Sequence, residues 1–175
     1  LSTEEARQIS GYGFLTAKPL LILQNIDESQ TPKIPEIEDE LALRLASPRV
    51  AWTAMCGKLE DELANMDPSE EQGFRESLQA GEAGAARMIK LSYKLLGLVS
   101  FLTTGPDEVR AWSIPHGTPA AKAAGVIHSD FERGFIRAEV VPFEDLERCG
   151  SMAEARRQGV LRAQGRNYVV KDGDV

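Results

Sequence analysis

The chain has 175 residues, of which 42% are hydrophobic and 27% are charged, and its formal net charge is −7 at pH 7. This balance is typical of globular proteins, and it excludes both an intrinsically disordered chain and a uniformly basic nucleic-acid binder. The apolar runs are far shorter than the ~20 residues that span a bilayer. The two cysteines stand apart, so we expect neither a disulfide framework nor a zinc site. The composition favours a reduced, cytoplasmic protein.

The first hundred residues predict a strand–helix–strand–helix series, the back half of an α/β layer. Residues 2–10 begin with a hydroxyl cap followed by two glutamates, which is typical of a helix start. Residues 19–23 form a continuous apolar run, which suits a strand buried on both faces of a parallel sheet. Pro32 and Pro35 predict an extended stretch after it. The remaining pattern predicts a second buried strand over residues 50–55 and helices over residues 37–46, 58–65, 68 onward and 85–98.

Beyond a boundary near residue 102, the pattern becomes that of a small α+β module. Residues 108–114 and 134–140 alternate apolar and polar side chains, as half-buried strands do. Two short helices fit between residues 143 and 157. Residues 168–170 precede an Asp-Gly pair that is typical of a hairpin turn. The second strand of that hairpin would begin at Val175, so the module is predicted to lack its final strand.

The turn after the first predicted strand carries residues with nucleotide chemistry. The amide of Asn25 can donate to N7 and accept from N6 of an adenine. In guanine-specific GTPases an Asp three residues later accepts from donors that adenine lacks, so Glu28 is compatible with adenine or with relaxed selectivity. Cys56 and Gly57 follow the second predicted strand, where such folds bring another loop over the base. A plain polar turn is the alternative interpretation.

We find no phosphate loop and no defensible catalytic set in the sequence. The Gly-Lys pair at residues 57–58 lacks the Gly-x-x-x-x-Gly-Lys-Ser/Thr spacing that cradles phosphates. His128, Asp130 and Glu132 could form a metal or catalytic cluster, as in a metal-dependent hydrolase, or a hydrogen-bonded turn at a strand edge. The turn is the stronger interpretation, so we expect no catalytic residue and no metal ligand.

Four arginines lie close together in the last quarter of the chain with a single acid, Glu154, among them: Arg156, Arg157, Arg162 and Arg166. Such a cluster can bind the phosphates of RNA. A solvated helical face is the alternative interpretation.

Five strings of residues together carry a family resemblance. They are FLTAKP at 14–19, Asn25-x-x-Glu28, FLTTGPDEVRAW at 101–112, AG-x-IH-x-DFE-x-GFI at 124–136 and GRNY-x-V-x-DGD at 165–174. In these strings the chain resembles, over nearly its whole length, the YchF/Obg-like ATPases, which are ribosome-binding P-loop proteins of the Obg-related GTPase class.

The resemblance implies the C-terminal part of a P-loop G-type domain, which is α/β, followed by an α+β TGS domain of β-grasp type. On this map residues 1–13 end an inserted helical arm. Residues 14–101 complete the nucleotide-binding domain, and residues 102–175 form a TGS domain that lacks its last strand.

The resemblance also implies roles and partners. In the family the Asn-x-x-Glu turn goes with a preference for ATP over GTP, which assigns base recognition to Asn25, Ile26 and Glu28, with Cys56 and Gly57 beside them. ATP and Mg²⁺ are implied for the intact protein, and the ribosome, through its RNA or protein, as partner, with neither membrane nor DNA.

The expected activity of this chain differs from that of the intact protein. The phosphate loop and the metal-holding residues of the family would lie upstream of Leu1, so we expect the chain alone to hold no nucleotide tightly and to be inactive. The alternative is a non-catalytic β-grasp adaptor that binds RNA or protein.

Overall fold

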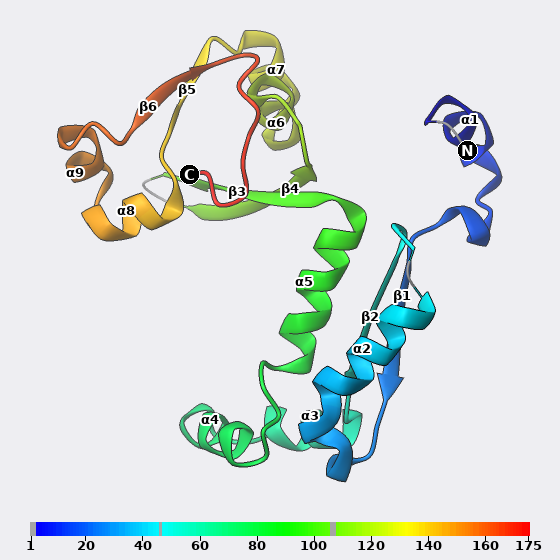
Figure 1. The fold of residues 1–175 in the computed structure, drawn as a ribbon. Coiled ribbons are helices and arrows are strands. Elements are labelled where there is room, and N and C mark those ends of the chain that lie inside the picture. Colours follow the sequence, from blue (N-terminus) through cyan, green and yellow to red (C-terminus); the bar gives the residue numbers. More distant parts are fainter. Residues whose placement is uncertain (1–2, 46, 106–107) are drawn as a thin grey trace. The chain divides into compact units, whose positions relative to one another are not determined.

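The chain folds into two units, Leu1–Leu96 and Gly97–Val175, in the computed structural model (Figure 1). The structure describes residues 3–45, 47–105 and 108–175. Each unit has its own hydrophobic core and its own strands.

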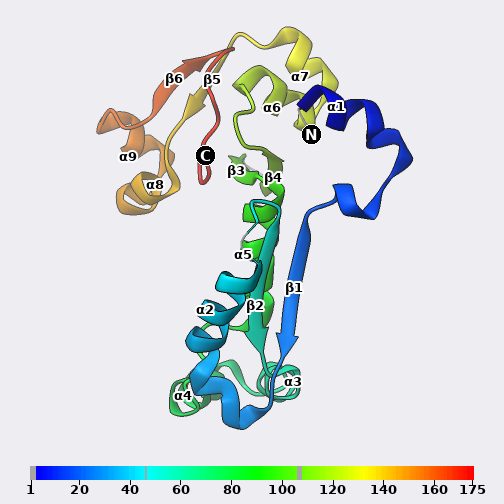
Figure 2. The same ribbon diagram turned by 45° about the vertical axis from the view of Figure 1, so that its right-hand side comes forward.

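The first unit is built on two parallel strands, β1 (Leu20–Asn25) and β2 (Val50–Met55), which pair in register along their whole length. Figure 2 shows the two strands side by side, with their carboxyl ends at the same edge. The helices of the unit are α1 (Thr3–Ile9), α2 (Ile34–Leu45), α3 (Gly57–Ala64), α4 (Pro68–Ser77) and α5 (Gly84–Leu96), with 3₁₀ turns η1 (Ser10–Tyr12), η2 (Leu15–Ala17) and η3 (Glu28–Lys33).

The core of the first unit gathers around the carboxyl end of β2. Ala54 is fully buried there, and Leu59 and Leu63 of α3 pack in the same cluster. Ile26, just beyond β1, and Ile34, at the start of α2, complete its aliphatic part. The hydrophobic residues thus hold together the edge at which both strands end.

The expectation for β2 is confirmed, but the expectation that the first strand is buried on both faces is wrong. Leu20 and Leu23 of β1 are 53% and 41% exposed. Among the described residues β1 pairs only with β2, and α5 is the helix that contacts it. A strand with one neighbour cannot bury both faces and both edges.

The prediction of an extended stretch at Pro32 and Pro35 is also wrong. Pro32 lies in η3, and Pro35 is the second residue of α2, which begins three residues earlier than predicted. The first N–H groups of a helix have no intrahelical partner, so a proline in the first turn sacrifices no hydrogen bond. The turn is held instead by Asp27, which accepts from the Ser29 N–H while its own N–H donates to the side chain of Gln30.

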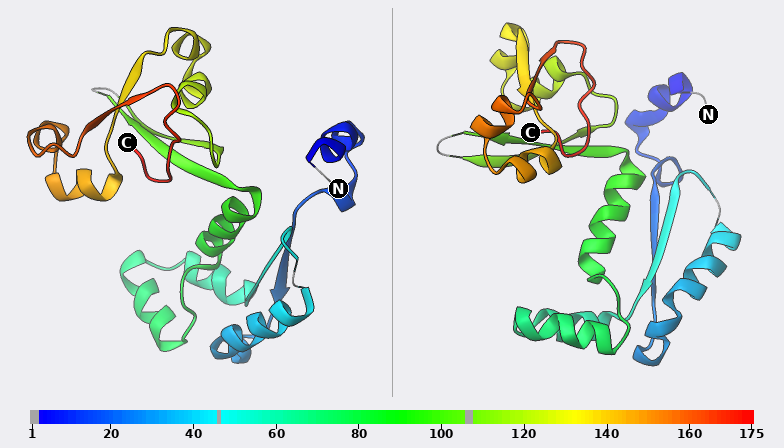
Figure 3. Two further views of the ribbon diagram at one scale, coloured as in Figure 1. Left: turned by 45° about the horizontal axis from the view of Figure 1, so that its top comes forward. Right: turned by 60° about the vertical axis from the view of Figure 1, so that its left-hand side comes forward.

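In its described residues, 97–105 and 108–175, the second unit combines antiparallel strand pairs with short helices (Figure 3). Strand β3 (Leu98–Thr104) pairs with β4 (Val109–Pro115), and β5 (Arg137–Val140) pairs with β6 (Arg162–Gly165). The helices are α6 (Ala120–Ile127), α7 (Ser129–Gly134), α8 (Phe143–Cys149) and α9 (Met152–Arg157). Val99, Phe101 and Ile114 of the first strand pair face Ala120 and Ala123 of α6 in one core.

Several predictions for the second unit are confirmed and others are corrected. The strand over residues 108–114 and the two helices between 143 and 157 are present as β4, α8 and α9. The strand predicted from residue 134 begins only at Arg137, since Gly134 ends α7. Strand β6 was not predicted, because its residues, Arg-Ala-Gln-Gly, carry no alternating apolar pattern.

The expected boundary near residue 102 falls inside β3, and the units divide at Gly97. The helical pattern over residues 85–98 ends at Leu96, and Gly97 adopts φ +62°, a left-handed conformation that ends helices. Leu98 then begins the strand that pairs with β4.

The predicted hairpin at the end of the chain takes another form. Residues 168–170 contribute one isolated bridge, between Pro119 and Val169, and Asp172-Gly173 forms a turn. Gly173 N–H then donates to Ser100 O (2.8 Å), and Leu102 N–H donates to Asp174 O (2.8 Å). The segment after the turn therefore bonds to β3 rather than folding back on residues 168–170. Within the described ranges, every helix is too short or too polar to cross a bilayer.

Candidate functional site

Asn25 and Gly57 meet at the edge where β1 and β2 end. The register places Asn25 opposite Met55, so the residues that follow the two strands emerge side by side. The Gly57 N–H donates to Asn25 Oδ1 over 2.9 Å. The Ile26 N–H donates to Met55 O over 3.0 Å, and the Ile26 side chain is buried in the core. The backbone of Ile26 and the amide of Asn25 are therefore fixed by the second strand and the loop after it.

Glycine at position 57 permits this approach. A Cβ built on Gly57 would lie 3.3 Å from Asn25 Oδ1, tighter than ordinary contact, so a side chain here would push the amide aside. Cys56 is the residue before α3, and its side chain is buried in the core cluster. Its carbonyl oxygen accepts from Glu60 N–H over 3.0 Å. Cys56 thus contributes backbone at the edge rather than an accessible thiol.

Glu28 lies apart from the Asn25–Gly57 contact. It is the first residue of η3, its side chain is exposed, and it has no hydrogen bond or ion pair to a described residue. It lines a wide hollow of about 490 Å³ together with Ser77, Leu78 and Gln79. Gln79 adopts φ +51°, and among the described residues it is the one non-glycine residue with positive φ. Strained backbone of this kind is frequent at ligand sites.

The neighbouring Asp27 caps η3. The backbone N–H of Ser29 and then its hydroxyl group hydrogen-bond to the carboxylate, and they lower the pKa of Asp27. Asp27 therefore stays ionised at neutral pH and fixes the start of the turn that carries Glu28.

A charge cluster braces α3 from behind the Gly57 loop. Arg75 of α4 is 9% exposed and forms a bidentate pair with Glu60 of α3, at 2.9 and 3.1 Å, and a second pair with Glu71 at 2.8 Å. Glu60 also accepts from the Gly84 N–H at the start of α5. Burial alone raises the pKa of Glu60, but the hydrogen bonds from Arg75 and Gly84 outweigh it and lower the pKa. Three helices are therefore joined through one carboxylate.

Close packing continues from this cluster to β2. A Cβ at Gly84 would lie 2.8 Å from Cε of Met55, the last residue of β2. The Arg87 guanidinium donates to Ala54 O over 2.7 Å. The start of α5 thus touches the strand end from which Cys56 and Gly57 emerge. None of these contacts was visible in the sequence, because their partners are separated by 15 to 33 residues.

The four arginines of the C-terminal cluster come from different segments and differ in their contacts. Arg156 pairs with Glu139 at 2.6 Å, and Arg157 pairs with Glu154 at 2.8 Å. The Arg166 guanidinium donates to Phe135 O over 2.6 Å. Arg162 lies on β6 rather than on a helix, and its guanidinium has no partner among the described residues.

His128 and Asp130 lie beside each other, with His128 Nδ1 3.7 Å from Asp130 Oδ2, whereas Glu132 pairs with another residue. His128 Nδ1 accepts from the Asp130 N–H and caps α7. Glu132 pairs with Lys122 at 2.5 Å. Within the described parts of the chain, no three His, Cys, Asp or Glu side chains are grouped so as to hold a metal ion.

The contact with Gly57 leaves part of the Asn25 amide available for hydrogen bonding. Gly57 uses one lone pair of the Asn25 amide oxygen, which leaves the other lone pair and both N–H donors of the amide. These are the groups that pair with N6 and N7 of adenine.

Comparison with known proteins agrees with the mixed α/β architecture. Over the second unit, residues 98–175 match the family model YchF-GTPase_C, whose description reads "Protein of unknown function (DUF933)". The solved structure of the Schizosaccharomyces pombe YchF GTPase matches with a TM-score of 0.82 and 31% identity, over 100% of this chain and 47% of that chain.

Curated relatives match along the whole chain. The ribosome-binding ATPase YchF of Bacillus subtilis (strain 168) is 42% identical over 98% of this chain and 48% of its own length. The Escherichia coli O157:H7 protein of the same name is 41% identical over 100% and 48%. Obg-like ATPase 1 of Xenopus laevis is 39% identical over 98% and 44%.

By these matches the chain falls in the class of mixed α/β proteins that includes the YchF and Obg-like ATPases. The chain is a member of the YchF family, and its second unit corresponds to the family's C-terminal domain model. It spans about half the length of the curated relatives it matches.

Proposed function

We propose that this chain is part of a ribosome-associated ATPase that prefers ATP over GTP. In this proposal the first unit supplies the base-recognition turn, and the second unit supplies a TGS platform for docking on the ribosome. The Bacillus subtilis and Escherichia coli relatives are called ribosome-binding ATPases, which supports the ribosome as partner and a cytoplasmic location. ATP and Mg²⁺ would be bound by the longer protein of which this chain is a part.

The hydrogen bond from Gly57 to Asn25 carries the base-recognition part. It turns the amide oxygen toward the second loop and holds the amide in one orientation, as selective recognition of a base edge requires. Ile26 would contribute its fixed backbone, and Cys56 the backbone of the second loop. Glu28 would act by disfavouring guanine, since it has no other partner in the described part of the chain and lies three residues beyond Asn25.

The β-grasp part rests on the edges of β3 and β5. Val141 and Val175 exchange two backbone hydrogen bonds of 3.0 and 2.9 Å, while Asp174 O accepts from Leu102 on β3. Residues 174–175 therefore bond to both strand regions at once. Beyond them a groove lined mainly by apolar side chains continues between Phe101 of β3 and Ala138 of β5. We infer that a further strand occupies this groove in a TGS domain.

We further propose that this chain alone neither binds ATP tightly nor hydrolyses it. Phosphoryl transfer depends on phosphate-loop amides, a lysine and Mg²⁺, whereas Asn25 and Glu28 would touch only the base. A base contact is worth a few kcal/mol at most, and about 4 kcal/mol corresponds to millimolar affinity. Calorimetric titration with ATP and Mg²⁺ tests this, and micromolar binding with steady phosphate release would contradict it.

Base choice is tested by titrating the ¹⁵N-labelled chain with AMP and with GMP at millimolar concentration. We expect AMP to shift the amide signals of Ile26 and Gly57, and Asn25→Ala to abolish these shifts. Asn65→Ala is the matched control, because the Asn65 amide donates to Asp61 O at the far end of α3. Glu28→Asp should move the preference toward GMP. Equal shifts with AMP and GMP in every variant would show that this turn does not select the base.

A further inference from the structure

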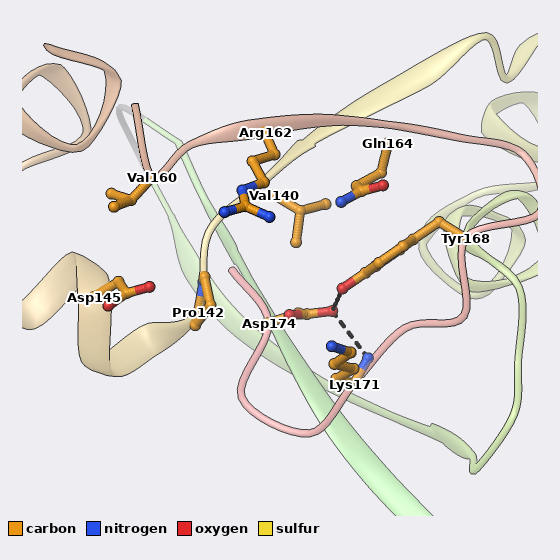
Figure 4. A pocket seen from close by; sticks show the side chains of 9 residues that line it. All are labelled: Val140, Pro142, Asp145, Val160, Arg162, Gln164, Tyr168, Lys171 and Asp174. Carbon is orange, nitrogen blue, oxygen red and sulfur yellow. Dashed lines mark hydrogen bonds between the residues drawn. The ribbon is translucent and has the colours of Figure 1, made fainter. Parts of the chain in front are cut away.

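A polar cavity of about 230 Å³ lies within the second unit, among the end of β5, the start of α8, β6 and the segment that follows β6 (Figure 4). Arg162 and Gln164 reach it from alternate positions of β6, which places their side chains on one face of the strand. Val140, which pairs with Arg162 in the ladder, forms the apolar wall.

The floor of this cavity is a fixed carboxylate. Asp174 is 5% exposed, and its Oδ2 accepts from the Tyr168 hydroxyl group and from the Lys171 N–H, each over 2.9 Å. Burial, and then the hydrogen bond to Asp174, raise the pKa of Tyr168 to about 12. The phenol therefore remains a donor at neutral pH, and both donors to Asp174 are uncharged groups.

Among the described residues, two cations of the cavity have no ion partner, and they outnumber the one lining carboxylate without one, Asp174. Asp145, the other acid in the wall, accepts from the Arg148 guanidinium over 2.7 Å. The Arg162 guanidinium and the Lys171 ammonium have no acceptor among the described residues, and neither does the Gln164 amide. A concave surface that presents two such cations and an amide donor is suited to an anion.

We propose that this cavity binds a phosphate ester, with Arg162, Lys171 and Gln164 as its donors. The planar fork of Arg162 matches two phosphate oxygens, and Lys171 adds a point charge. The cavity is smaller than the roughly 300–1,000 Å³ of sites for drug-sized ligands, so it takes one phosphate with a neighbouring group. The free oxygen of Asp145 is placed to accept from a hydroxyl group of that neighbour.

Two sources share this chemistry, a free mononucleotide and the backbone of an RNA strand. The RNA source deepens the docking part of the proposed function and rests on it, whereas the mononucleotide source is independent of it. The site also divides the arginine cluster, since it uses Arg162 and leaves Arg156 and Arg157 in their ion pairs.

The test titrates the ¹⁵N-labelled chain with AMP and with a short single-stranded RNA, and follows the amide signals of residues 162–174. We expect Arg162→Gln and Lys171→Gln each to weaken binding about tenfold or more, since a hydrogen bond to a charged group contributes roughly 1.5–3 kcal/mol. Arg156→Gln and Arg157→Gln are the controls, and they should leave the affinity within about threefold because those side chains already hold carboxylates.

The outcomes separate the sources and the failures. If RNA binds in an Arg162-dependent manner and AMP does not, the ligand is the backbone of an RNA strand. If AMP binds in this manner and RNA does not, the ligand is a mononucleotide. Binding that Arg162→Gln and Lys171→Gln leave unchanged, or no binding of either probe at millimolar concentration, overturns the proposal. A ribosome pelleting assay is read separately. If the chain does not pellet with ribosomes but still binds AMP in an Arg162-dependent manner, the proposed docking function is wrong and the phosphate site stands.

Discussion

The two units stabilise their buried charges in opposite ways. In the first unit an ionised pair, Arg75 with Glu60, lies behind the Gly57 loop and joins three helices. In the second unit a neutral phenol, Tyr168, donates to a buried carboxylate, Asp174. The shift of Glu60 lowers its pKa, whereas that of Tyr168 raises its pKa. The first arrangement therefore fails when acid protonates Glu60, and the second fails when base deprotonates Tyr168.

The difference shows how each candidate site is supported. The Asn25–Gly57 edge has its bracing behind the loop, in contacts that no ligand would touch. The cavity of the second unit has its bracing in the wall itself, because Tyr168 and Asp174 line the space. A variant can thus damage the first site from a distance, whereas the second site is damaged mainly by variants that also reach the ligand.

The largest losses of stability should come from substitutions in the two hydrophobic cores, and they set the scale for the other comparisons between the units. Leu63→Ala in the first unit and Ile114→Ala in the second remove side chains that are 2% and 0% exposed. Each should lower the free energy of unfolding of its own unit by about 2–5 kcal/mol, the cost of a large cavity. Hydrogen exchange resolved by residue measures this. Equal loss of protection in both units from either variant would contradict separate cores.

Removing the buried cation should be nearly as costly in the first unit. Arg75→Ala leaves Glu60 and Glu71 without their partner, and breaking such a pair costs about 3 kcal/mol. Urea denaturation measures the loss. Lys58→Ala is the control, since its pair with Glu62 is exposed and should contribute less than about 0.5 kcal/mol. Similar midpoints for the two variants would show that the cluster does not brace α3.

The alkaline limit distinguishes the second unit. Because the folded pKa of Tyr168 is about 12 against 10.0 ordinarily, its contribution is fully present below pH 10 and is lost as the pH rises toward 12. We expect Tyr168→Phe to cost about 1 kcal/mol at pH 8 and to flatten this loss. Thermal unfolding between pH 8 and 12 measures both. An unchanged alkaline slope in the variant would assign the loss to other groups.

In the same way, the loss of stability at low pH should arise in the first unit. The lowered pKa of Glu60 gives stability that is present above its ordinary value of 4.5 and is lost as the pH falls below it. Thermal unfolding from pH 6 to pH 3 should therefore show a decline that Glu60→Gln reduces. Glu62→Gln, on the exposed face of α3, should leave the decline intact.

The smallest effects should come from the caps. Ser151 accepts from the Glu154 N–H at the start of α9, and Ser151→Ala should cost about 0.5–1 kcal/mol at any pH. Asp27→Ala removes the cap of η3, and its effect should shrink as the pH falls below 3.8, the ordinary pKa of this group, because stability from a carboxylate with a lowered pKa is lost there. Melting temperatures at pH 7 and pH 3 compare the two, and a pH-independent effect of Asp27→Ala would contradict a charged cap.

Periodicity and local signals predicted most elements of the fold. Helices α3 and α4 and strand β2 follow from caps and apolar spacing within one segment, which single-sequence reasoning can use. The exposure of β1 could not be predicted, because an apolar run looks the same whether its neighbours lie inside the chain or elsewhere. Strand β6 was missed because Arg162 and Gln164 face a polar cavity, which removes the apolar alternation.

The candidate residues divide along the same line. The closeness of Asn25 and Gly57 was expected, since consecutive parallel strands end at one edge. The contact of Arg156 with Glu139 could not be read from spacing, because Glu139 lies on β5, whereas Arg157 and Glu154 are three residues apart on one helix. The cavity around Arg162 depends on residues from four segments, so no local motif could announce it.

At Gly97, the first residue of the second unit, the chirality of the amino acid decides whether a side chain is tolerated. Its φ of +62° is unfavourable for an L-amino acid, while a Cβ there would meet no atom within 4 Å. Gly97→Ala should therefore cost about 1 kcal/mol through chirality alone. A D-alanine introduced by chemical ligation has the mirror preference and would favour the native backbone, while restricting the unfolded chain. The same methyl group would thus destabilise the protein in one enantiomer and stabilise it in the other.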